Sequence, residues 1–125
     1  PLQIINTHLG LNNKERMVHS KELLDRGWLT HPDCKEPVIL CGDFNALPGT
    51  KVFKFLNNYL ISAQIKEYKT EHKRTWGGLL PIICLDHIFI SQDIEVDNVQ
   101  VCDSYLARLA SDHRPLIADL KIKEM

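Results

Sequence analysis

The sequence predicts an α/β fold in which helices pack against mixed β-sheets. Short apolar runs typical of strands alternate with segments whose apolar residues recur at helical spacing. The chain has 125 residues and 44% hydrophobic content, which suffices for one domain, or part of one, with a real core. Interleaved strands and helices of these lengths favour a layered architecture over a helical bundle.

Five segments are expected to form strands because β-branched and aliphatic residues gather or alternate in them. The strand opened by Pro37 and ended by Asp43 is a nearly continuous apolar run, which is typical of a buried strand. Residues 95–102 and 116–122 alternate apolar and polar side chains, a pattern typical of strands with one buried face. The other two expected strands are residues 86–90 and residues 3–5, the latter leading into His8.

Two helices are expected between these strands. Asn12 or Asn13 can cap a helix that runs to about Arg26, and Gly27 is a suitable stop. Thr50 can cap a second helix. The apolar residues of this second helix follow the i, i+3, i+4, i+7 pattern of a buried face: Val52, Phe55, Leu56 and Tyr59.

Charge and cysteine usage narrow the classes of function. The 15 basic and 16 acidic residues give a formal net charge of -1, which argues against a nonspecific, strongly electrostatic nucleic-acid binder. No stretch approaches the roughly 20 apolar residues needed to span a bilayer. None of the 4 cysteines sits in a C-x-x-C pair, which argues against a zinc site and favours a reduced, cytoplasmic setting.

The first candidate site lies at the end of the central strand. Asp43 and Asn45 are two residues apart, so continued extended geometry would point both side chains to one side. Polar groups at the carboxyl end of a buried strand are well placed to meet a ligand, and metal-assisted attack on a phosphate ester suits them. The alternative is a purely structural Asx turn with Pro48 and Gly49.

A second polar cluster precedes the last expected strand, where Asp112 and His113 stand just before its apolar residues. Taken alone, a histidine in this position is more often a surface or capping group. The two clusters mirror each other, because one follows a strand and the other precedes one.

Four short blocks occur in order along the chain: residues 6–10 (NTHLG), 42–45 (GDFN), 85–90 (LDHIFI) and 111–115 (SDHRP). They resemble the motifs of the endonuclease/exonuclease/phosphatase superfamily, which includes pancreatic-type deoxyribonuclease, apurinic endonucleases, deadenylases, bacterial sphingomyelinases and inositol-phosphate phosphatases. The resemblance implies a deoxyribonuclease-like α/β/β/α sandwich of four layers with two mixed sheets. A complete family domain is longer, so residues 1–125 are expected to be its C-terminal half, supplying about one sheet and its outer helices.

The resemblance also implies a hydrolase of phosphate esters that depends on a divalent metal ion. Asp43 would orient or deprotonate the attacking water, while Asn45 would hold the water and the phosphate. His113 would donate a hydrogen bond to the phosphate and stabilise its charge. Asp86 would hold His113 in contact and raise its pKa.

Further roles follow from the same resemblance. His8 matches a phosphate-contacting histidine, although a strand-end histidine with only a local hydrogen bond is the alternative. Asp112 matches a ligand of Mg²⁺ or Mn²⁺, and the principal metal-binding glutamate belongs to the N-terminal half. The basic residues of the stretch 66–74, and not the resemblance, lead us to expect a substrate loop with Arg74 on a phosphate; the alternative is a solvated loop whose Trp76 packs into the core. The other histidines are expected to be structural or surface groups: His19, His31, His72 and His87.

The substrate class stays open among nucleic acid, phospholipid and small phosphate esters, because specificity depends on loops. The competing hypothesis is a noncatalytic binding or scaffold module that keeps the fold. Without the missing glutamate, the chain alone is expected to be inactive. Apolar strand faces are expected to pack against the missing half or a second copy, around Ile5, Ile39, Ile88 and Ile117.

Overall fold

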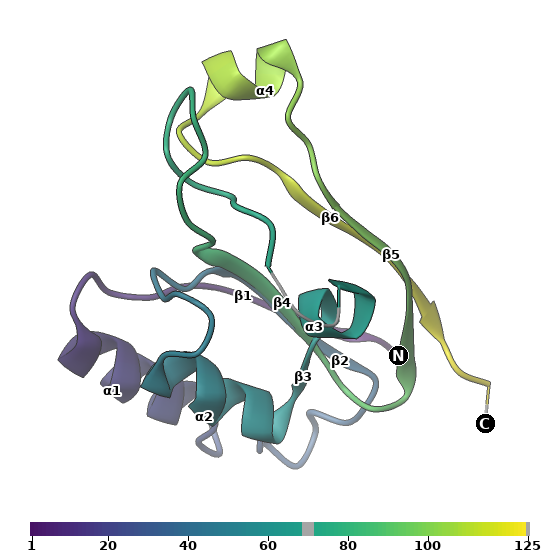
Figure 1. The fold of residues 1–125 in the computed structure, drawn as a ribbon. Coiled ribbons are helices and arrows are strands. Elements are labelled where there is room, and N and C mark those ends of the chain that lie inside the picture. Colours follow the sequence, from purple (N-terminus) through teal and green to yellow (C-terminus); the bar gives the residue numbers. More distant parts are fainter. Residues whose placement is uncertain (69–71, 125) are drawn as a thin grey trace.

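A computed structural model describes residues 1–68 and 72–124 as one four-stranded sheet, one two-stranded sheet and their helices (Figure 1). In the larger sheet β1 (Gln3–His8) pairs in parallel with β2 (Val38–Asp43), and β2 pairs antiparallel with β4 (Asp86–Ile90). The opposite edge of β4 carries the short β3 (Ile61–Ser62), giving the order β1-β2-β4-β3. The expected mixed α/β architecture is therefore confirmed.

The second sheet is the antiparallel pair β5 (Ile94–Val101) and β6 (Leu116–Ile122). The chain between these strands contains the short helix α4 (Tyr105–Ala110), which stands at the end of the pair in Figure 1. The sequence led us to expect one sheet of a sandwich, whereas the structure has strands in two separate sheets. The alternating apolar residues of β5 and β6 explain this, because together with α3 they cover the face of the first sheet opposite α1 and α2.

The two capped helices form where the sequence predicts them. Helix α1 (Asn13–Leu23) begins after Asn12, whose side chain accepts a hydrogen bond from the Glu15 amide. The helix ends at Leu23 rather than near Arg26, because the chain turns there and the buried Leu29 donates its amide hydrogen bond to the Leu23 carbonyl. Burial of Leu29 thus overrides the helical tendency of the residues between them.

Helix α2 (Lys51–Tyr59) is followed by β3 and by α3 (Ala63–Tyr68). Its buried side chains are Val52, Phe53 and Leu56, whereas Tyr59 of the expected face is 49% exposed. The buried face of α2 is therefore rotated toward Phe53, relative to the face expected from the sequence. None of the helices in the described part of the chain has the length and apolar character needed to cross a membrane.

Two apolar clusters hold the layers together. One joins α1 and α2 to the nearer face of the larger sheet and includes Leu40, Leu56 and Phe89. The other lies between the opposite face of that sheet, α3 and the β5–β6 pair, and is centred on Ile90 and Ile94. Alternate residues of β4 therefore serve different clusters, as the two-residue period of a strand requires.

The sequence named four isoleucines on strand faces that were expected to lack a partner, and the structure places only two of them on such a face. Ile39 and Ile88 are half-buried beside the second cluster, as a partly covered face requires. Ile5 instead packs against the helix-side cluster, and its neighbour Ile4 is the exposed residue at 63%. Ile117 points away from the second cluster, because its neighbours on β6 are the residues that face it. The sequence assignment of Ile5 and Ile117 to that face was wrong, since the register places each on the other side.

The cap at Thr50 gives a first testable expectation. Its hydroxyl accepts a hydrogen bond from the Phe53 amide, so Thr50→Ala leaves that amide without its side-chain partner. We expect the free energy of unfolding to fall by about 1 kcal/mol. Urea denaturation of the full-length protein would measure this, and Thr50→Ser should retain most of the stability. Equal midpoints for Thr50→Ala and the wild type would contradict the capping role.

Candidate active site

The ends of three strands bring the candidate residues to one edge of the larger sheet. In the parallel register His8 is opposite Asp43, and in the antiparallel register Asp43 is opposite Asp86. Paired residues share one face of a sheet, so these three side chains lie on the same side. Asp86 begins β4 because that strand runs opposite to β2, which ends at Asp43.

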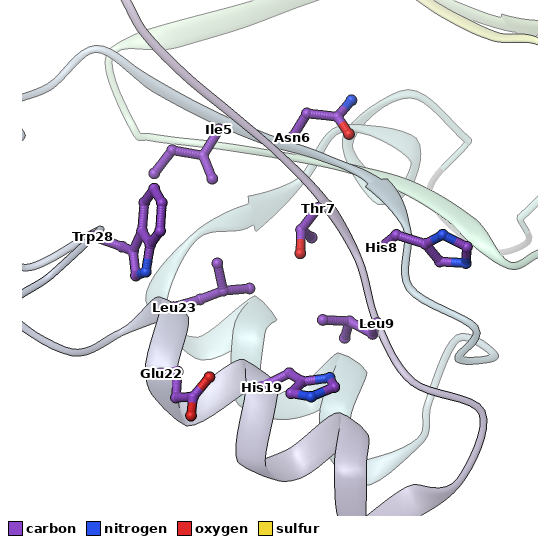
Figure 2. Close-up of a pocket in the computed structure, with 9 residues that line it drawn as sticks. All are labelled: Ile5, Asn6, Thr7, His8, Leu9, His19, Glu22, Leu23 and Trp28. Atoms are coloured by element: carbon purple, nitrogen blue, oxygen red, sulfur yellow. The ribbon is translucent and has the colours of Figure 1, made fainter.

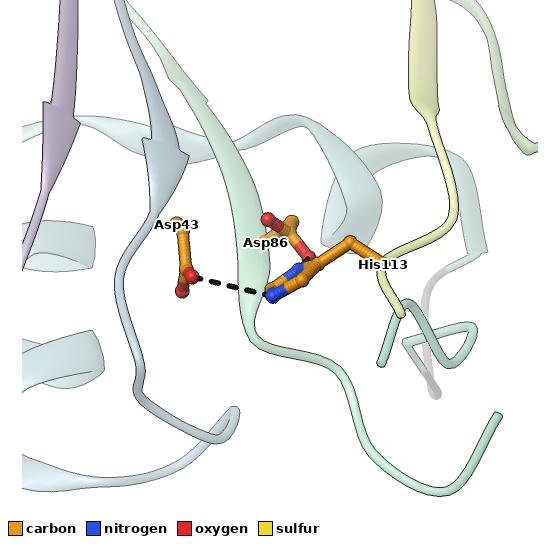
Figure 3. Close-up of side chains that lie close together, drawn as sticks. All are labelled: Asp43, Asp86 and His113. Atoms are coloured by element: carbon orange, nitrogen blue, oxygen red, sulfur yellow. Dashed lines mark hydrogen bonds and ion pairs between the residues drawn. The ribbon is translucent and has the colours of Figure 1, made fainter. Parts of the chain in front are cut away.

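His113 reaches this edge from the second sheet, just before β6 (Figure 3). Its Nδ1 lies 2.7 Å from Asp86 Oδ2, and its Nε2 lies 3.5 Å from Asp43 Oδ2. The contact predicted between Asp86 and His113 is therefore present. The imidazole lies between two carboxylates that come from neighbouring strands.

The electrostatic setting favours a cationic imidazole. Partial burial lowers the pKa of His113, but the hydrogen bond that His113 donates to Asp86 and the charges of Asp86, Asp43 and Asp112 raise it by more. The net effect places the His113 pKa above its ordinary value. A cationic group here is suited to donating a hydrogen bond to an anionic oxygen.

The turn after β2 differs from the extended geometry expected for Asp43 and Asn45. The strand ends at Asp43, and Asn45 has a left-handed φ of 48°. The Asn45 amide donates to Asp43 Oδ1 at 2.8 Å, and Asn45 Nδ2 donates to the Leu9 carbonyl at 2.7 Å. An Asx-type turn is therefore present, but within residues 43–45 rather than with Pro48 and Gly49, and it leaves the second oxygen of Asp43 facing the imidazoles.

Gly42 makes this close packing possible. It has a φ of 141°, and an added Cβ would lie 1.9 Å from the Thr7 carbonyl oxygen of the neighbouring strand. No larger residue fits there without moving β1. The glycine before Asp43 thus lets β1 and β2 approach at the site.

The remaining sequence candidates lie around this centre. His8 is 73% exposed, with Nε2 at 3.4 Å from Asp43 Oδ2. Asp112 and Arg74 are exposed and belong to neither the ion pairs nor the hydrogen bonds of the centre among the described residues. Lys69 and Glu71 of the expected substrate loop lie outside the described residues.

Asp43, Asp86 and His113 also form a group that could hold a metal ion. One ligand atom from each lies within 4.8 Å of the others. Hard divalent cations prefer oxygen ligands, and this group offers two carboxylates. The group therefore fits such an ion. Asp112 is outside this group, and its role as a ligand stays a prediction.

Two hollows adjoin the centre. One, of about 440 Å³, is lined by residues of β1, β2, β4 and the start of β6, including Asp43 and Asp86. Another, of about 270 Å³, lies between β1 and α1 and is lined by His8, His19 and Trp28 among others (Figure 2). His19 is already engaged there, because its Nδ1 accepts from the Gly10 amide. The two catalytic candidates with a carboxylate, Asp43 and Asp86, both line the first hollow.

Sequence reasoning missed buried polar residues beside the centre. Arg114 has a side chain with 0% exposure, and its Nε donates to Asp103 Oδ1 at 2.9 Å. A second guanidinium nitrogen donates to the Gly78 carbonyl, so Arg114 ties the residues after His113 to the loop after Trp76. The motif SDHRP contained Arg114, and its position next to His113 was the signal that could have found it.

His87 follows Asp86 on β4 and points to the opposite face, as expected from strand geometry. It is 1% exposed among Phe44, Phe53 and Phe89, and its Nε2 lies 2.7 Å from the Ala46 carbonyl. Burial lowers the His87 pKa from 6.5 to about 4, against the opposing effect of the hydrogen bond to Ala46.

This burial predicts a loss of stability in acid. Between pH 6.5 and about 4 the unfolded chain binds a proton at His87 that the folded chain does not. The free energy of unfolding should therefore fall by roughly 2 to 3 kcal/mol as the pH drops through this window. Urea denaturation at pH 7 and 4.5 would measure it, with His87→Leu as the comparison. A fall of the same size in His87→Leu would assign the effect to other groups.

The chain is similar to known proteins in both sequence and structure. The sequence matches the model described as the Endonuclease/Exonuclease/phosphatase family over residues 6–113. Among solved structures, the chain is similar to the human Nocturnin catalytic domain with bound sulfate anion, at 25% identity and a TM-score of 0.70, covering 96% of this chain and 47% of that one. It is also similar to a mannosyl-6-phosphatase of Bacteroides thetaiotaomicron, at 20% identity and a TM-score of 0.73, covering 95% and 51%.

A functionally unknown protein of Enterococcus faecalis is similar too, at 20% identity and a TM-score of 0.72, covering 96% of this chain and 50% of that one. Matches below 25% identity concern the fold alone. No curated protein matches the sequence. The chain spans about half the length of the solved structures that it matches.

Proposed function

The chain belongs to the endonuclease/exonuclease/phosphatase family, and we propose that it supplies the water-activating half of an enzyme that hydrolyses phosphate esters. The match confirms the resemblance drawn from the four sequence blocks. One observation carries the proposal: His113 lies between Asp43 and Asp86, 27 residues from Asp86 in sequence yet bonded to it at 2.7 Å. Contacts with two carboxylates from neighbouring strands are not expected of an isolated surface histidine.

Each group has a distinct task in this proposal. Asp43 accepts the proton of a water whose oxygen attacks phosphorus, while the bond from phosphorus to the leaving oxygen breaks. The His113 imidazolium, held by Asp86, donates a hydrogen bond to a phosphate oxygen on which negative charge develops. Asn45 orients the water and the phosphate, and the exposed His8 contacts another phosphate oxygen. Arg74 binds a phosphate at the edge of the site.

We further propose that the enzyme uses Mg²⁺ or Mn²⁺. Asp112 is the ligand that this chain would supply, and its exposed carboxylate offers the oxygen atoms that these ions prefer. The ion would neutralise charge on the phosphate oxygens. A glutamate outside this chain completes the ligand set in this proposal.

The experiment that tests the function is a substrate panel on the full-length protein with Mg²⁺ and Mn²⁺. Bis(p-nitrophenyl) phosphate reports diester cleavage and p-nitrophenyl phosphate reports monoester cleavage. Oligonucleotides, phospholipid vesicles and sugar phosphates then distinguish the substrate classes. Metal-dependent turnover that disappears on chelation supports the proposal. No turnover of any substrate by a folded protein would favour the alternative of a noncatalytic binding or scaffold module.

We propose that residues 1–125 form the C-terminal half of a sandwich whose other half covers the part of the larger sheet, around β1, that β5 and β6 leave exposed. The half-length coverage of the similar structures and the exposed Ile4 on β1 support this. We expect the chain alone to be nearly inactive and to self-associate through this face. Sedimentation of residues 1–125 would test it. A stable monomer that unfolds cooperatively would contradict the assignment.

A further inference from the structure

Thr75 joins the two sheets at the candidate site, and we propose that it is a positioning residue that sets the distance between Asp86 and His113. The inference rests on the proposed function for its catalytic consequence, although its structural part does not. Thr75 lies directly after Arg74 and before Trp76, in the segment that follows the expected substrate loop. Its side chain is fully buried, with 0% exposure.

The Thr75 side chain is bonded to the segment that carries Asp86. Thr75 Oγ1 accepts hydrogen bonds from the Leu85 amide at 3.1 Å and from the Asp86 amide at 3.2 Å. The same Leu85 residue uses its carbonyl to accept from the Phe44 amide at 3.0 Å, next to Asp43. A single hydroxyl oxygen therefore fixes the backbone at the start of β4, where Asp86 begins and where the turn after Asp43 is attached.

The main chain beside Thr75 is bonded to the segment that carries His113. The Thr75 carbonyl accepts from the Arg114 amide at 2.6 Å, and Trp76 forms a β-bridge with His113 itself. His113 belongs to the segment that leads into β6 of the second sheet, whereas Asp86 belongs to the first sheet. Thr75 is bonded to both segments, through its side chain on one side and its main chain on the other.

This arrangement explains why a side-chain oxygen is needed at position 75. The amides of Leu85 and Asp86 lie at the start of β4, and the Thr75 hydroxyl is their hydrogen-bond acceptor. If the hydroxyl is removed, the main-chain bond to Arg114 survives but the Asp86 side of the link is released. The carboxylate then loses its fixed position relative to the imidazole, and small displacements of catalytic groups lower rates substantially.

Two substitutions separate the hydroxyl from the shape of the side chain. Thr75→Val keeps the volume and removes the acceptor, whereas Thr75→Ser keeps the acceptor and removes a methyl group. In the full-length protein, with bis(p-nitrophenyl) phosphate and Mn²⁺, we expect Thr75→Val to lower kcat about tenfold or more. We expect KM to change little, because the hydroxyl contacts no substrate, and Thr75→Ser to restore kcat to near the wild-type value.

A second readout does not need activity. The His113 Nδ1 proton in its short bond to Asp86 should give a low-field proton resonance, assigned by its loss in His113→Gln. We expect the resonance in the wild type and in Thr75→Ser, and its loss or broadening in Thr75→Val. Thr50→Val is the matched control, because it removes a threonine hydroxyl that caps α2 and is not bonded to either segment. It should lower the melting temperature and leave kcat and the resonance unchanged.

The outcomes are distinguishable. If the wild type hydrolyses none of the substrates, the proposed function fails, and the resonance alone decides whether Thr75 positions the pair. If Thr75→Val keeps both the resonance and the wild-type kcat, the inference is overturned while the proposed function stands. If Thr75→Val does not fold, Thr75→Ala replaces it, because alanine removes the hydroxyl without placing a methyl group against the Leu85 and Asp86 amides. A wild-type resonance and kcat in Thr75→Ala would then overturn the inference.

Discussion

Replacing His113 with alanine in the full-length enzyme is expected to lower kcat by at least about 100-fold, with a much smaller change in KM. The imidazolium is proposed to bind the phosphate most strongly when negative charge has developed on its oxygens, so its loss affects the transition state more than the ground state. Steady-state kinetics with the best substrate of the panel would measure the effect.

A matched control is available in the same chain. His31 contacts Asp33 at 3.9 Å in an exposed pair outside the candidate site, so His31→Ala removes a histidine with an acidic partner but should keep normal kinetics. The kcat of Asp86→Asn should lie between those of His113→Ala and His31→Ala. His113 then keeps a hydrogen-bond partner but loses the negative charge that favours its protonated form. Near-normal turnover by His113→Ala would remove His113 from the mechanism.

The second large effect is expected for Asp43→Asn, with kcat lowered by about 100-fold or more. The amide has almost the size of the carboxylate and can still accept the hydrogen bond from the Asn45 amide through its oxygen. The turn after β2 should therefore persist while the group that takes the proton of water is lost. KM should change less than kcat, because the base acts in the chemical step.

Asp119 on β6 supplies the control, since it is exposed and outside the site. Asp119→Asn changes the net charge by the same amount and should leave kcat unaltered. Thermal unfolding of both variants would show whether the fold is retained. If Asp43→Asn turns over substrate at the wild-type rate, another group must activate the water.

Much of the site followed from local sequence signals. The strand ending at Asp43 is a compact apolar run, and the strand beginning at Asp86 has the same character, so their ends could be placed within about one residue. The cap at Thr50 was also predicted correctly, and the cap at Asn12 is one of the two asparagines considered, because a cap depends on a side chain and an amide three residues away. The contact between Asp86 and His113 followed from the family motifs rather than from periodicity.

Other features depend on partners far away in sequence. The end of α1 is set by the burial of Leu29, and the left-handed Asn45 is held by the Leu9 carbonyl. Thr75 carried no local pattern, and the motif that contains Arg114 did not indicate its contacts, since the partners of both residues are backbone groups and a carboxylate from other segments. Neither the secondary-structure propensity of these residues nor their spacing along the chain indicates such contacts.

The sequence by itself determined the α/β class, most element positions and the family motifs that contain Asp43, Asp86 and His113. Those properties arise from short-range effects, namely side-chain period, capping and motif order. Only the tertiary structure decided that His113 lies between the two carboxylates and that Thr75 links the two sheets. The physical reason is that strand register and sheet packing bring together residues that the chain separates, and hydrogen bonds of 2.6 to 3.2 Å form only after this packing.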